Sequence, residues 1–323
     1  MASLLAVDGG GTSTRCQVVD EEFGVLAEVT GPPCALAVDL ERALEALAET
    51  VQSALQQAAD QWRRLGAGRD RGPLRLASAC LGLSGLLATG AEEQVRAALC
   101  AALRKAGLSL SAKRVVVVSD IEIAHAGALG GEAGIVLVVG TGAVAFGRNA
   151  AGQSARADGW GWLLGDGGSG FWIGQRALQA VCAAADGRGE PTGLTEPVLA
   201  HFGVGRVDEL PRALYGTFDR TRIAAVALLV AQQAEAGDAV SREILRCAGE
   251  ELGTSVLGVL RRLPFPGDSV VVSWQGSVIR RAPGLAAQVE AAVRAVEPRC
   301  RFRAPQAEPI AGAVLLARRA AGA

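Results

Sequence analysis

One pattern occurs twice in this chain: an apolar strand, a short glycine turn and a second strand. The first copy is LLAVD, the glycines Gly9–Gly11 and TRCQVVD, and the second is GIVLVVGTG followed by AVAFGRN. A tight turn between two strand-like segments predicts an antiparallel hairpin. Because the two copies resemble each other and lie far apart in the sequence, we expect two similarly built lobes.

The segments around these hairpins alternate between strand and helix patterns. Residues 114–120, RVVVVSD, form a continuous apolar strand, which is typical of a sheet covered on both faces. Residues 39–65 carry apolar side chains at helical spacing, whereas residues 186–221 are expected to be loop and short helix. This alternation predicts an α/β fold with mixed sheets and flanking helices. The predicted helices are 39–65, 91–106, 121–129, 169–185, 222–236, 238–263, 284–296 and 309–321. Further strands are predicted at 25–29 and 301–305, and the segments 74–85 and 268–278 are each predicted to be a strand that ends in a turn.

The composition excludes several classes of protein. The 323 residues are 50% apolar and 20% charged, with a net charge of −1. This balance argues against wholesale disorder and against a dedicated nucleic-acid binder. No apolar stretch is long enough to cross a bilayer, and the N-terminal MASLLAVDGGGT is expected to be a first strand and not a signal peptide. Seven scattered cysteines without a C-x-x-C pair indicate buried thiols in a reducing cytosol, so we expect a cytoplasmic protein.

Missing motifs narrow the chemistry further. The two lysines, Lys105 and Lys113, do not follow a G-x-x-x-x-G stretch, so the chain has no Walker A loop. The two histidines, His125 and His201, belong to no H-E-x-x-H motif, which argues against a zinc hydrolase. The G-x-S-x-G motif of serine hydrolases is also absent from the sequence.

Three strands end in glycine-containing polar turns, at Asp8–Thr12, Gly140–Gly142 and Gln275–Ser277. In an open α/β sheet, ligands bind at the carboxyl ends of the strands. Glycines allow backbone N–H groups to approach phosphate oxygens, and Thr12 and Thr141 add hydroxyl donors. Any one of these glycines could serve only its own turn, but three such turns favour nucleotide binding.

Two carboxylates also follow strands. Asp8 could hold Mg²⁺ through water, because this metal keeps much of its hydration shell in proteins. Asp120 ends the four-valine strand, where a carboxylate could deprotonate the hydroxyl that attacks a phosphoryl group. The alternative for Asp120 is an N-cap that satisfies free N–H groups of the following helix. The two roles for Asp120 are compatible.

The segment Asp158–Gly174 concentrates glycine and tryptophan around a carboxylate. Flat aromatic faces and hydrogen-bonding groups suit a sugar, which offers apolar C–H faces and hydroxyls. We expect Trp160 and Asp166 to contact such a ligand. For Trp162 and Trp172 we expect packing in the core.

Taken in order, five segments resemble the N-acetylglucosamine kinase family of the BadF/BadG/BcrA/BcrD-type ATPases, in the actin and hexokinase superfamily. They are AVDGGGTSTRCQVVD, VVSDIEIAHAGALGG, GIVLVVGTGAVAFGRN, DGWGWLLGDGGSGFWIG and VVSWQGSVI, and the similarity continues to the closing PIAGAVLLA. The resemblance implies two ribonuclease-H-like lobes with the nucleotide in the cleft between them. The lobes would be residues 1–130 with 308–323, and residues 131–307.

The resemblance also implies roles for individual residues. ATP and Mg²⁺ would be the cofactors, with Asp8 positioning the metal and Asp120 acting as base for the 6-hydroxyl of the sugar. The residues implied to contact the nucleotide are Gly10, Gly11, Thr12, Thr141, Gly142, Ala224, Gly276 and Ser277. The residues implied to line the sugar site, besides Asp120, are Cys34, Gly159, Trp160, Gly161 and Asp166.

The chain departs from the family pattern at two positions. Relatives usually have an asparagine that contacts a sugar hydroxyl where this chain has Cys34. They also usually have GDEGS, whereas this chain has GDGGS, with Gly167 in place of the glutamate. Each lost hydrogen bond costs on the order of 1 kcal/mol in sugar binding. The departures therefore leave open a different or more weakly bound sugar.

The sequence predicts an ATP-dependent kinase that phosphorylates an amino sugar, most simply N-acetylglucosamine at its 6-hydroxyl. The expected partner is a small-molecule sugar, without nucleic acid or membrane, and relatives are often homodimers. One alternative is an ATPase that activates a radical dehydratase, which needs an iron–sulfur cluster held by cysteines across a dimer. The other is a non-catalytic nucleotide or sugar sensor, which Cys34 and Gly167 support.

Overall fold

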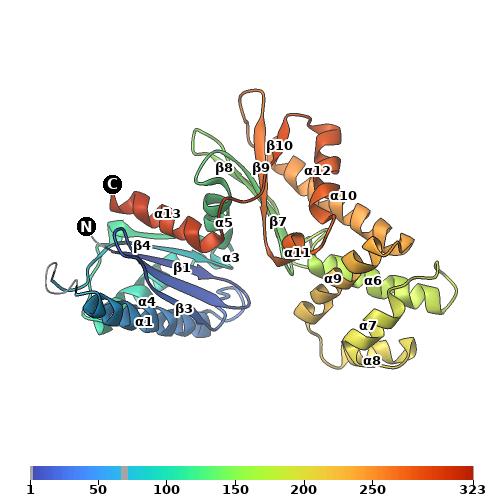
Figure 1. Cartoon of the computed structure of the whole chain (residues 1–323), viewed down its shortest axis with the longest axis horizontal. Coiled ribbons are helices and arrows are strands. Elements are labelled where there is room, and N and C mark those ends of the chain that lie inside the picture. The colour runs from blue at the N-terminus through green and yellow to red at the C-terminus, as the bar shows by residue number, and fades with distance from the viewer. Residues whose placement is uncertain (1–2, 67–71, 323) are drawn as a thin grey trace. The chain divides into compact units, whose positions relative to one another are not determined.

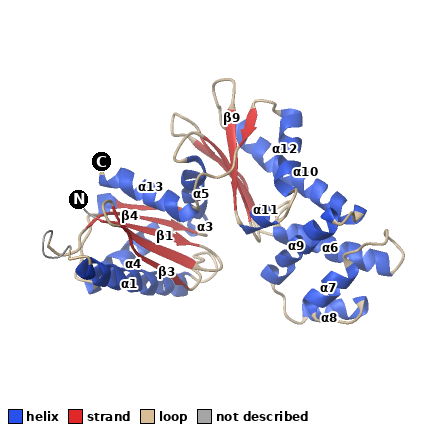
Figure 2. Ribbon diagram, in the orientation of Figure 1, coloured by secondary structure: helices blue, strands red, loops and turns tan. Residues whose placement is uncertain are grey.

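The computed structural model describes residues 3–66 and 72–322, and the strands in these ranges form two five-stranded sheets (Figure 2). Contacts between residues divide the chain into two compact units. The first comprises the described residues up to Glu132 together with those from Pro305 onward, and the second is Ala133–Ala304. The closing segment of the chain therefore returns to the unit in which the chain begins.

The first sheet combines an antiparallel hairpin with parallel strands. Its strands are β1 (Ser3–Gly9), β2 (Thr14–Asp20), β3 (Gly24–Gly31), β4 (Leu76–Leu83) and β5 (Val115–Ser119). They lie in the order β3-β2-β1-β4-β5. The first three are antiparallel neighbours, and β4 and β5 continue in parallel beyond β1. The carboxyl ends of β1, β4 and β5 consequently meet at one edge of the sheet.

Helices cover both faces of this sheet. They are α1 (Leu40–Arg64), α3 (Leu86–Thr89), α4 (Glu92–Lys105), α5 (Asp120–Leu129) and α13 (Pro309–Ala321). One face packs against α1 and α4, and the other packs against α5 and α13 (Figure 1). Leu5 belongs to the first core and Leu4 to the second, because successive strand residues point to opposite faces. A strand buried on both sides explains the continuous apolar run LLAV.

The second sheet repeats this arrangement. Its strands are β6 (Gly134–Val139), β7 (Ala143–Arg148), β8 (Ser154–Asp158), β9 (Val270–Gln275) and β10 (Cys300–Phe302). They lie in the order β10-β9-β6-β7-β8, with β6, β7 and β8 antiparallel and β9 and β10 parallel to β6. The hairpin-plus-parallel topology is thus the same in both sheets.

Helices form a large part of the second unit (Figure 1). They are α6 (Gly170–Ala185), α7 (Thr195–Phe202), α8 (Leu210–Tyr215), α9 (Arg220–Glu235), α10 (Ala239–Arg262), α11 (Ser277–Arg281) and α12 (Leu285–Val296). The helix α10 packs against α12, α9 and β7, and α6 packs against α9. Within residues 3–66 and 72–322, no helix combines the length and apolar content that crossing a membrane requires.

The predicted fold class is confirmed: the protein is α/β, with two mixed sheets and flanking helices. One strand was missed, because β8 has the polar sequence SARAD and lies at a sheet edge, where little apolar surface marks it. Residues 186–221, expected to be loop and short helix, hold α7, α8 and the start of α9 at Arg220. The strand predicted within 268–278 is β9, which ends at Gln275 before the predicted glycine turn, and α11 follows that turn.

Candidate functional site

Asp8 and Asp120 lie at the same edge of the first sheet. Asp8 is opposite Gly82 in β4, and the next residue of that strand, Leu83, is opposite Ser119 at the end of β5. Asp120 follows directly. Neighbouring strands are about 4.8 Å apart, and Asp120 lies two residues beyond Val118, which is level with Asp8, so the backbones of the two aspartates are roughly 12 Å apart. Parallel pairing therefore brings together two carboxyls that are far apart in the sequence.

Asp120 is the first residue of α5, and its side chain is held in place. Its carboxyl accepts a hydrogen bond from the N–H of Ile121 at 2.9 Å and another from the hydroxyl of Ser84. Burial raises the pKa of Asp120, and these hydrogen bonds oppose the rise. The alternative N-cap role is wrong, because Ser119 is the N-cap and its N–H and hydroxyl donate to the Glu122 carboxylate, both at 3.1 Å.

Asp8 lies in an unfavourable place for a negative charge. Burial, reinforced by the charges of Asp120 and Glu308, raises the pKa of Asp8 from 3.8 to about 6. Arg15 opposes the rise, but it is shared with Glu308 at 2.6 Å and Glu28 at 2.8 Å. A carboxylate that is short of positive charge beside a second carboxylate suits a cation bound together with phosphates.

Replacing Asp8 with asparagine should stabilise the unliganded protein in a pH-dependent way. The pKa of Asp8 is higher in the folded state, so its contribution favours folding below about pH 4 and is lost as the pH rises through about 6. The variant should exceed the wild type by up to about 3 kcal/mol in free energy of unfolding at pH 8, and the two should converge near pH 4. Urea unfolding at both pH values measures this, and a pH-independent difference would contradict the assignment.

The first glycine turn joins β1 to β2 and exposes its tip. The Gly10 N–H donates to the Ser13 carbonyl at 3.0 Å, and the Cys34 N–H donates to the Gly10 carbonyl at 3.1 Å. Gly11 and Thr12 are exposed to solvent. The Thr12 hydroxyl and the backbone N–H groups of this tip are thus available to a ligand.

Cys34 holds this turn through its backbone, while its thiol points into the core. The side chain is 0% exposed, and the thiol donates to the Ala43 carbonyl at 3.3 Å. Burial raises the pKa of this thiol to about 11. A direct contact between the thiol and a sugar would therefore require the loop to move.

The second glycine turn, between β6 and β7, meets the start of α6. The Gly140 N–H donates to the Gly142 carbonyl at 2.9 Å. The first N–H groups of the helix donate to carbonyl oxygens of the turn. The Gly170 N–H donates to the Gly140 carbonyl at 2.9 Å, and the Phe171 N–H donates to the Thr141 carbonyl at 3.2 Å. Thr141 and Gly142 are half-buried at the end of a central strand.

Two other predicted nucleotide contacts lie in the same part of the second unit. A Cβ at Gly276 would collide with the Val139 carbonyl oxygen, so the turn before α11 touches the end of β6. A Cβ at Gly170 would lie 3.2 Å from the Cβ of Ala224, which packs into the core at 5% exposure. Ser277 is exposed at the start of α11. The structure thus brings Thr141, Gly142, Ala224, Gly276 and Ser277 to one end of the second sheet.

The glycine- and tryptophan-rich loop is organised by a residue to which the sequence analysis assigned no role. The carboxylate of Asp158 accepts hydrogen bonds from the N–H groups of Gly159 at 2.8 Å, Asp166 at 2.7 Å and Gly167 at 3.2 Å. These bonds join the two ends of the loop and hold Gly159 in place, whereas the backbone of Gly161 donates to the carboxyl of Asp166. The position of Asp158 as the first acidic residue of the DGWGWLLGD segment was the available signal.

Asp166 ties this loop to the second glycine turn. A Cβ at Gly142 would lie only 2.6 Å from Oδ2 of Asp166, and this carboxyl accepts a hydrogen bond from the Ala143 backbone. Burial, more than the nearby Asp158 charge, raises the pKa of Asp166. Its backbone has φ of 59°, so the loop turns sharply there. Sugar-loop and phosphate-turn candidates are therefore direct neighbours in the second unit.

The tryptophans of the loop differ in their surroundings. Trp160 is 65% exposed, with the Arg156 guanidinium 5.1 Å from its ring centre. The prediction that Trp162 packs in the core is wrong, because its side chain is 40% exposed, with its ring centre 5.4 Å from the ring centres of both Phe171 and Phe218. Trp172, on the following helix, is half-buried against the core as expected. The local sequence does not predict which of these indoles is exposed, because their burial depends on the conformation of the loop.

Comparisons with known proteins agree on one family. The model of the BadF/BadG/BcrA/BcrD ATPase family matches residues 5–317. An N-acetylmuramic acid/N-acetylglucosamine kinase of Clostridium acetobutylicum is 30% identical over 98% of this chain and 99% of its own length. An N-acetyl-D-glucosamine kinase of Dictyostelium discoideum is 28% identical over 97% of each chain. A solved structure from Chromobacterium violaceum, described provisionally as an N-acetylglucosamine kinase, is 28% identical with a TM-score of 0.71 over 98% of this chain and 99% of its own.

Proposed function

Because the chain belongs to the BadF/BadG/BcrA/BcrD ATPase family, we propose that it transfers the γ-phosphoryl group of ATP to an amino sugar. The expected acceptor is the 6-hydroxyl of N-acetylglucosamine. The observation that carries the proposal is the pair of desolvated carboxyls, Asp8 and Asp120, at one sheet edge beside a solvent-exposed glycine turn. Full-length similarity to two curated amino-sugar kinases supports the same activity.

In this mechanism Asp120 is the general base. Its carboxylate accepts the proton of the sugar hydroxyl as that oxygen bonds to the γ-phosphorus and ADP leaves. The raised pKa of Asp120 makes it a better proton acceptor, and the hydrogen bonds from Ser84 and Ile121 orient it. These two hydrogen bonds keep the orientation of the carboxyl fixed while it changes its protonation state.

Asp8 would hold Mg²⁺, with water and phosphate oxygens completing the metal's shell. Among the described residues no group of three or more His, Cys, Asp or Glu side chains could hold a metal. A set of one or two carboxylates is nevertheless typical for Mg²⁺ that arrives with a nucleotide. Such an ion neutralises charge on the phosphates. The burial of Asp8 beside the second carboxyl, Asp120, supports this role, because a bound cation would offset the negative charge there.

The remaining candidates divide into phosphate, nucleoside and sugar contacts. We assign Gly10, Gly11, Thr12, Thr141 and Gly142 to the phosphates, and Gly276, Ser277 and Ala224 to the nucleoside. We assign Gly159, Trp160, Gly161 and Asp166 to the sugar, and Cys34 to the same site through its backbone. The exposed tip of the first turn, Gly11 and Thr12, supports the first assignment. The exposed indole of Trp160 supports the third.

The wider organisation is also a proposal. We propose that residues 1–130 with 308–323 and residues 131–307 act as two lobes. We further propose a cytoplasmic homodimer that binds no nucleic acid. Light scattering coupled to gel filtration measures the oligomeric state.

A coupled ADP-release assay tests the proposed activity. The sugars are N-acetylglucosamine, glucosamine, N-acetylmuramic acid, N-acetylmannosamine and glucose, with a control lacking sugar. We expect sugar-dependent ADP release, greatest with N-acetylglucosamine. ATP binding without product from any sugar would favour a sensor instead. An iron–sulfur activator is not favoured, since Cys16 and Cys80 are fully buried and burial raises the pKa of each thiol to about 12.

A further inference from the structure

Asp166 and Gly167, which are consecutive in the glycine- and tryptophan-rich loop, face different neighbours. The Asp166 carboxylate faces the second glycine turn, next to Gly142. A Cβ at Gly167 would instead point toward α10 and lie 2.9 Å from Oε2 of Glu251 and 3.2 Å from its Cβ. Gly167, which has no side chain of its own, is therefore approached by a carboxylate from another element.

The space beside Gly167 and Glu251 is a pocket of about 470 Å³. It combines two indoles, two carboxylates and two hydroxyls with the backbone of the loop. The side chains are Asp158, Trp160, Trp172, Glu251, Thr254 and Ser255. Flat aromatic surfaces beside hydrogen-bonding groups match the apolar faces and hydroxyls of a sugar. The pocket also shares Trp160 with the loop assigned to the sugar.

Glu251 is the carboxylate in this pocket that is available to a ligand. Asp158 is engaged by the loop N–H groups, and the Ser255 hydroxyl lies 3.4 Å from its Oδ2. The side chain of Glu251 is exposed, and within the described ranges it has no hydrogen bond or ion pair. Lysine and arginine are absent from the described residues that line the pocket, and Arg156 lies over the indole of Trp160. The Arg176 guanidinium likewise lies 5.0 Å from the ring centre of Trp172, so arginines flank both indoles, but none of the described residues forms an ion pair with Glu251.

We propose that Glu251, which reaches Gly167 from α10, supplies a carboxylate to the sugar site. The pocket beside it then holds one face of the sugar ring and the polar groups attached to that face. Glu251 accepts hydrogen bonds from hydroxyl, amide or ammonium groups of the substrate. Its charge repels a sugar that carries a carboxylate, such as N-acetylmuramic acid. The inference rests on the proposed sugar kinase activity and makes the preferred substrate a neutral or amine-bearing sugar.

Glu251→Gln tests the proposal, because it removes the charge and keeps the shape. A hydrogen bond to a charged group is worth enough that the KM for N-acetylglucosamine should rise about tenfold, with kcat and the KM for ATP within about twofold of wild type. The ratio of kcat/KM for N-acetylmuramic acid to that for N-acetylglucosamine should rise in the same variant. The double variant Gly167→Glu, Glu251→Ala should recover most of the lost affinity.

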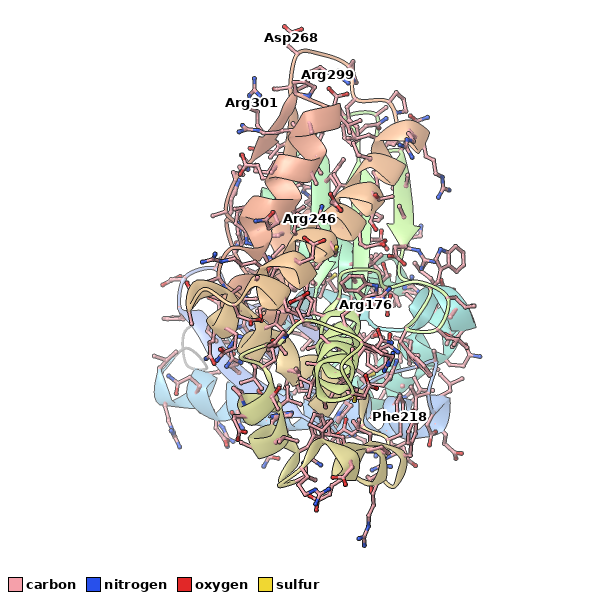
Figure 3. All side chains as sticks on the ribbon, turned by 90° about the vertical axis from the view of Figure 1, so that its right-hand side faces the viewer. Arg176, Phe218, Arg246, Asp268, Arg299 and Arg301 are labelled. Carbon is pink, nitrogen blue, oxygen red and sulfur yellow. The ribbon has the colours of Figure 1, made fainter. Side chains whose placement is uncertain are left out.

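The neighbouring Glu250 provides a matched control. It is exposed on the same helix, but it pairs with Arg246 on the outer side of α10 (Figure 3). Glu250→Gln should leave every sugar KM unchanged. An unchanged KM for N-acetylglucosamine in Glu251→Gln, with an active wild type, would overturn the proposal.

Direct binding separates this inference from the proposed activity. If the wild type releases no ADP with any sugar, the kinase proposal fails. Calorimetric titration of N-acetylglucosamine into the wild type and into Glu251→Gln then decides the role of Glu251. About tenfold weaker binding by the variant would support that role, whereas equal binding, or no binding by the wild type, would overturn it.

Discussion

Replacing Asp120 with asparagine is expected to lower kcat for sugar phosphorylation by about 10³-fold while leaving ATP affinity nearly unchanged. Asparagine has the same shape, and its amide oxygen can still accept the Ile121 N–H, but it cannot take the proton of the sugar hydroxyl. Steady-state assays give kcat, and calorimetry gives the dissociation constant for ATP. Turnover close to wild type would contradict the role of Asp120 as base.

Ser119→Ala is the control for this experiment. Ser119 caps the same helix one residue earlier, so its loss should cost about 1 kcal/mol in stability. The kcat should stay within about threefold of wild type if α5 only has to present Asp120. A loss of kcat as large as that in Asp120→Asn would show that the position of the helix, and not the proton acceptor, explains the first result.

The second large effect is expected for Gly276→Ala. Gly276 has φ of 106° and ψ of 159°, a backbone conformation that almost only glycine adopts. An alanine Cβ there would also collide with the backbone carbonyl of Val139, which cannot move without disturbing β6. The two costs together should lower the free energy of unfolding by about 3–5 kcal/mol. Affinity for ATP should fall as well if Gly276 and Ser277 contact the nucleoside.

Gly267→Ala separates the cost of the backbone conformation from the cost of the steric collision. Gly267 has a similar φ of 102°, but a Cβ there would meet nothing within 4 Å. This variant should lose only about 1–2 kcal/mol and keep its ATP affinity. Thermal and urea unfolding of both variants measure the difference, and equal destabilisation would show that the Val139 contact is unimportant.

The main-chain architecture follows largely from local sequence. Period-two alternation in TRCQVVD and helical spacing in residues 39–65 depend on neighbours in the chain, and β2 and α1 form there. The strand β8 escaped prediction because an edge strand with the sequence SARAD has little apolar surface to bury. The prediction that Trp162 packs in the core failed because the burial of a tryptophan in a glycine-rich loop depends on tertiary contacts that the local sequence does not specify.

The site was predictable only in part. Asp8, Asp120 and the glycine turns could be identified from their positions at strand ends, because parallel strands bring such ends together. Asp158 was overlooked because its role is to bind backbone N–H groups of its own loop, which no residue pattern reveals. Glu251 was not detectable at all, because it lies on α10 and approaches Gly167 only through the packing of that helix.

The amino-acid sequence by itself determined the two hairpin units, the α/β class and the strand-end carboxyls, since these depend on local periodicity and on the chemistry of single residues. Only the tertiary structure decided which groups became neighbours. Desolvation and the approach of Asp120 raise the pKa of Asp8, and helix packing brings Glu251 to the place where the loop lacks a side chain. Both effects depend on contacts between residues distant in the chain, and these contacts exist only after the sheets and helices have packed.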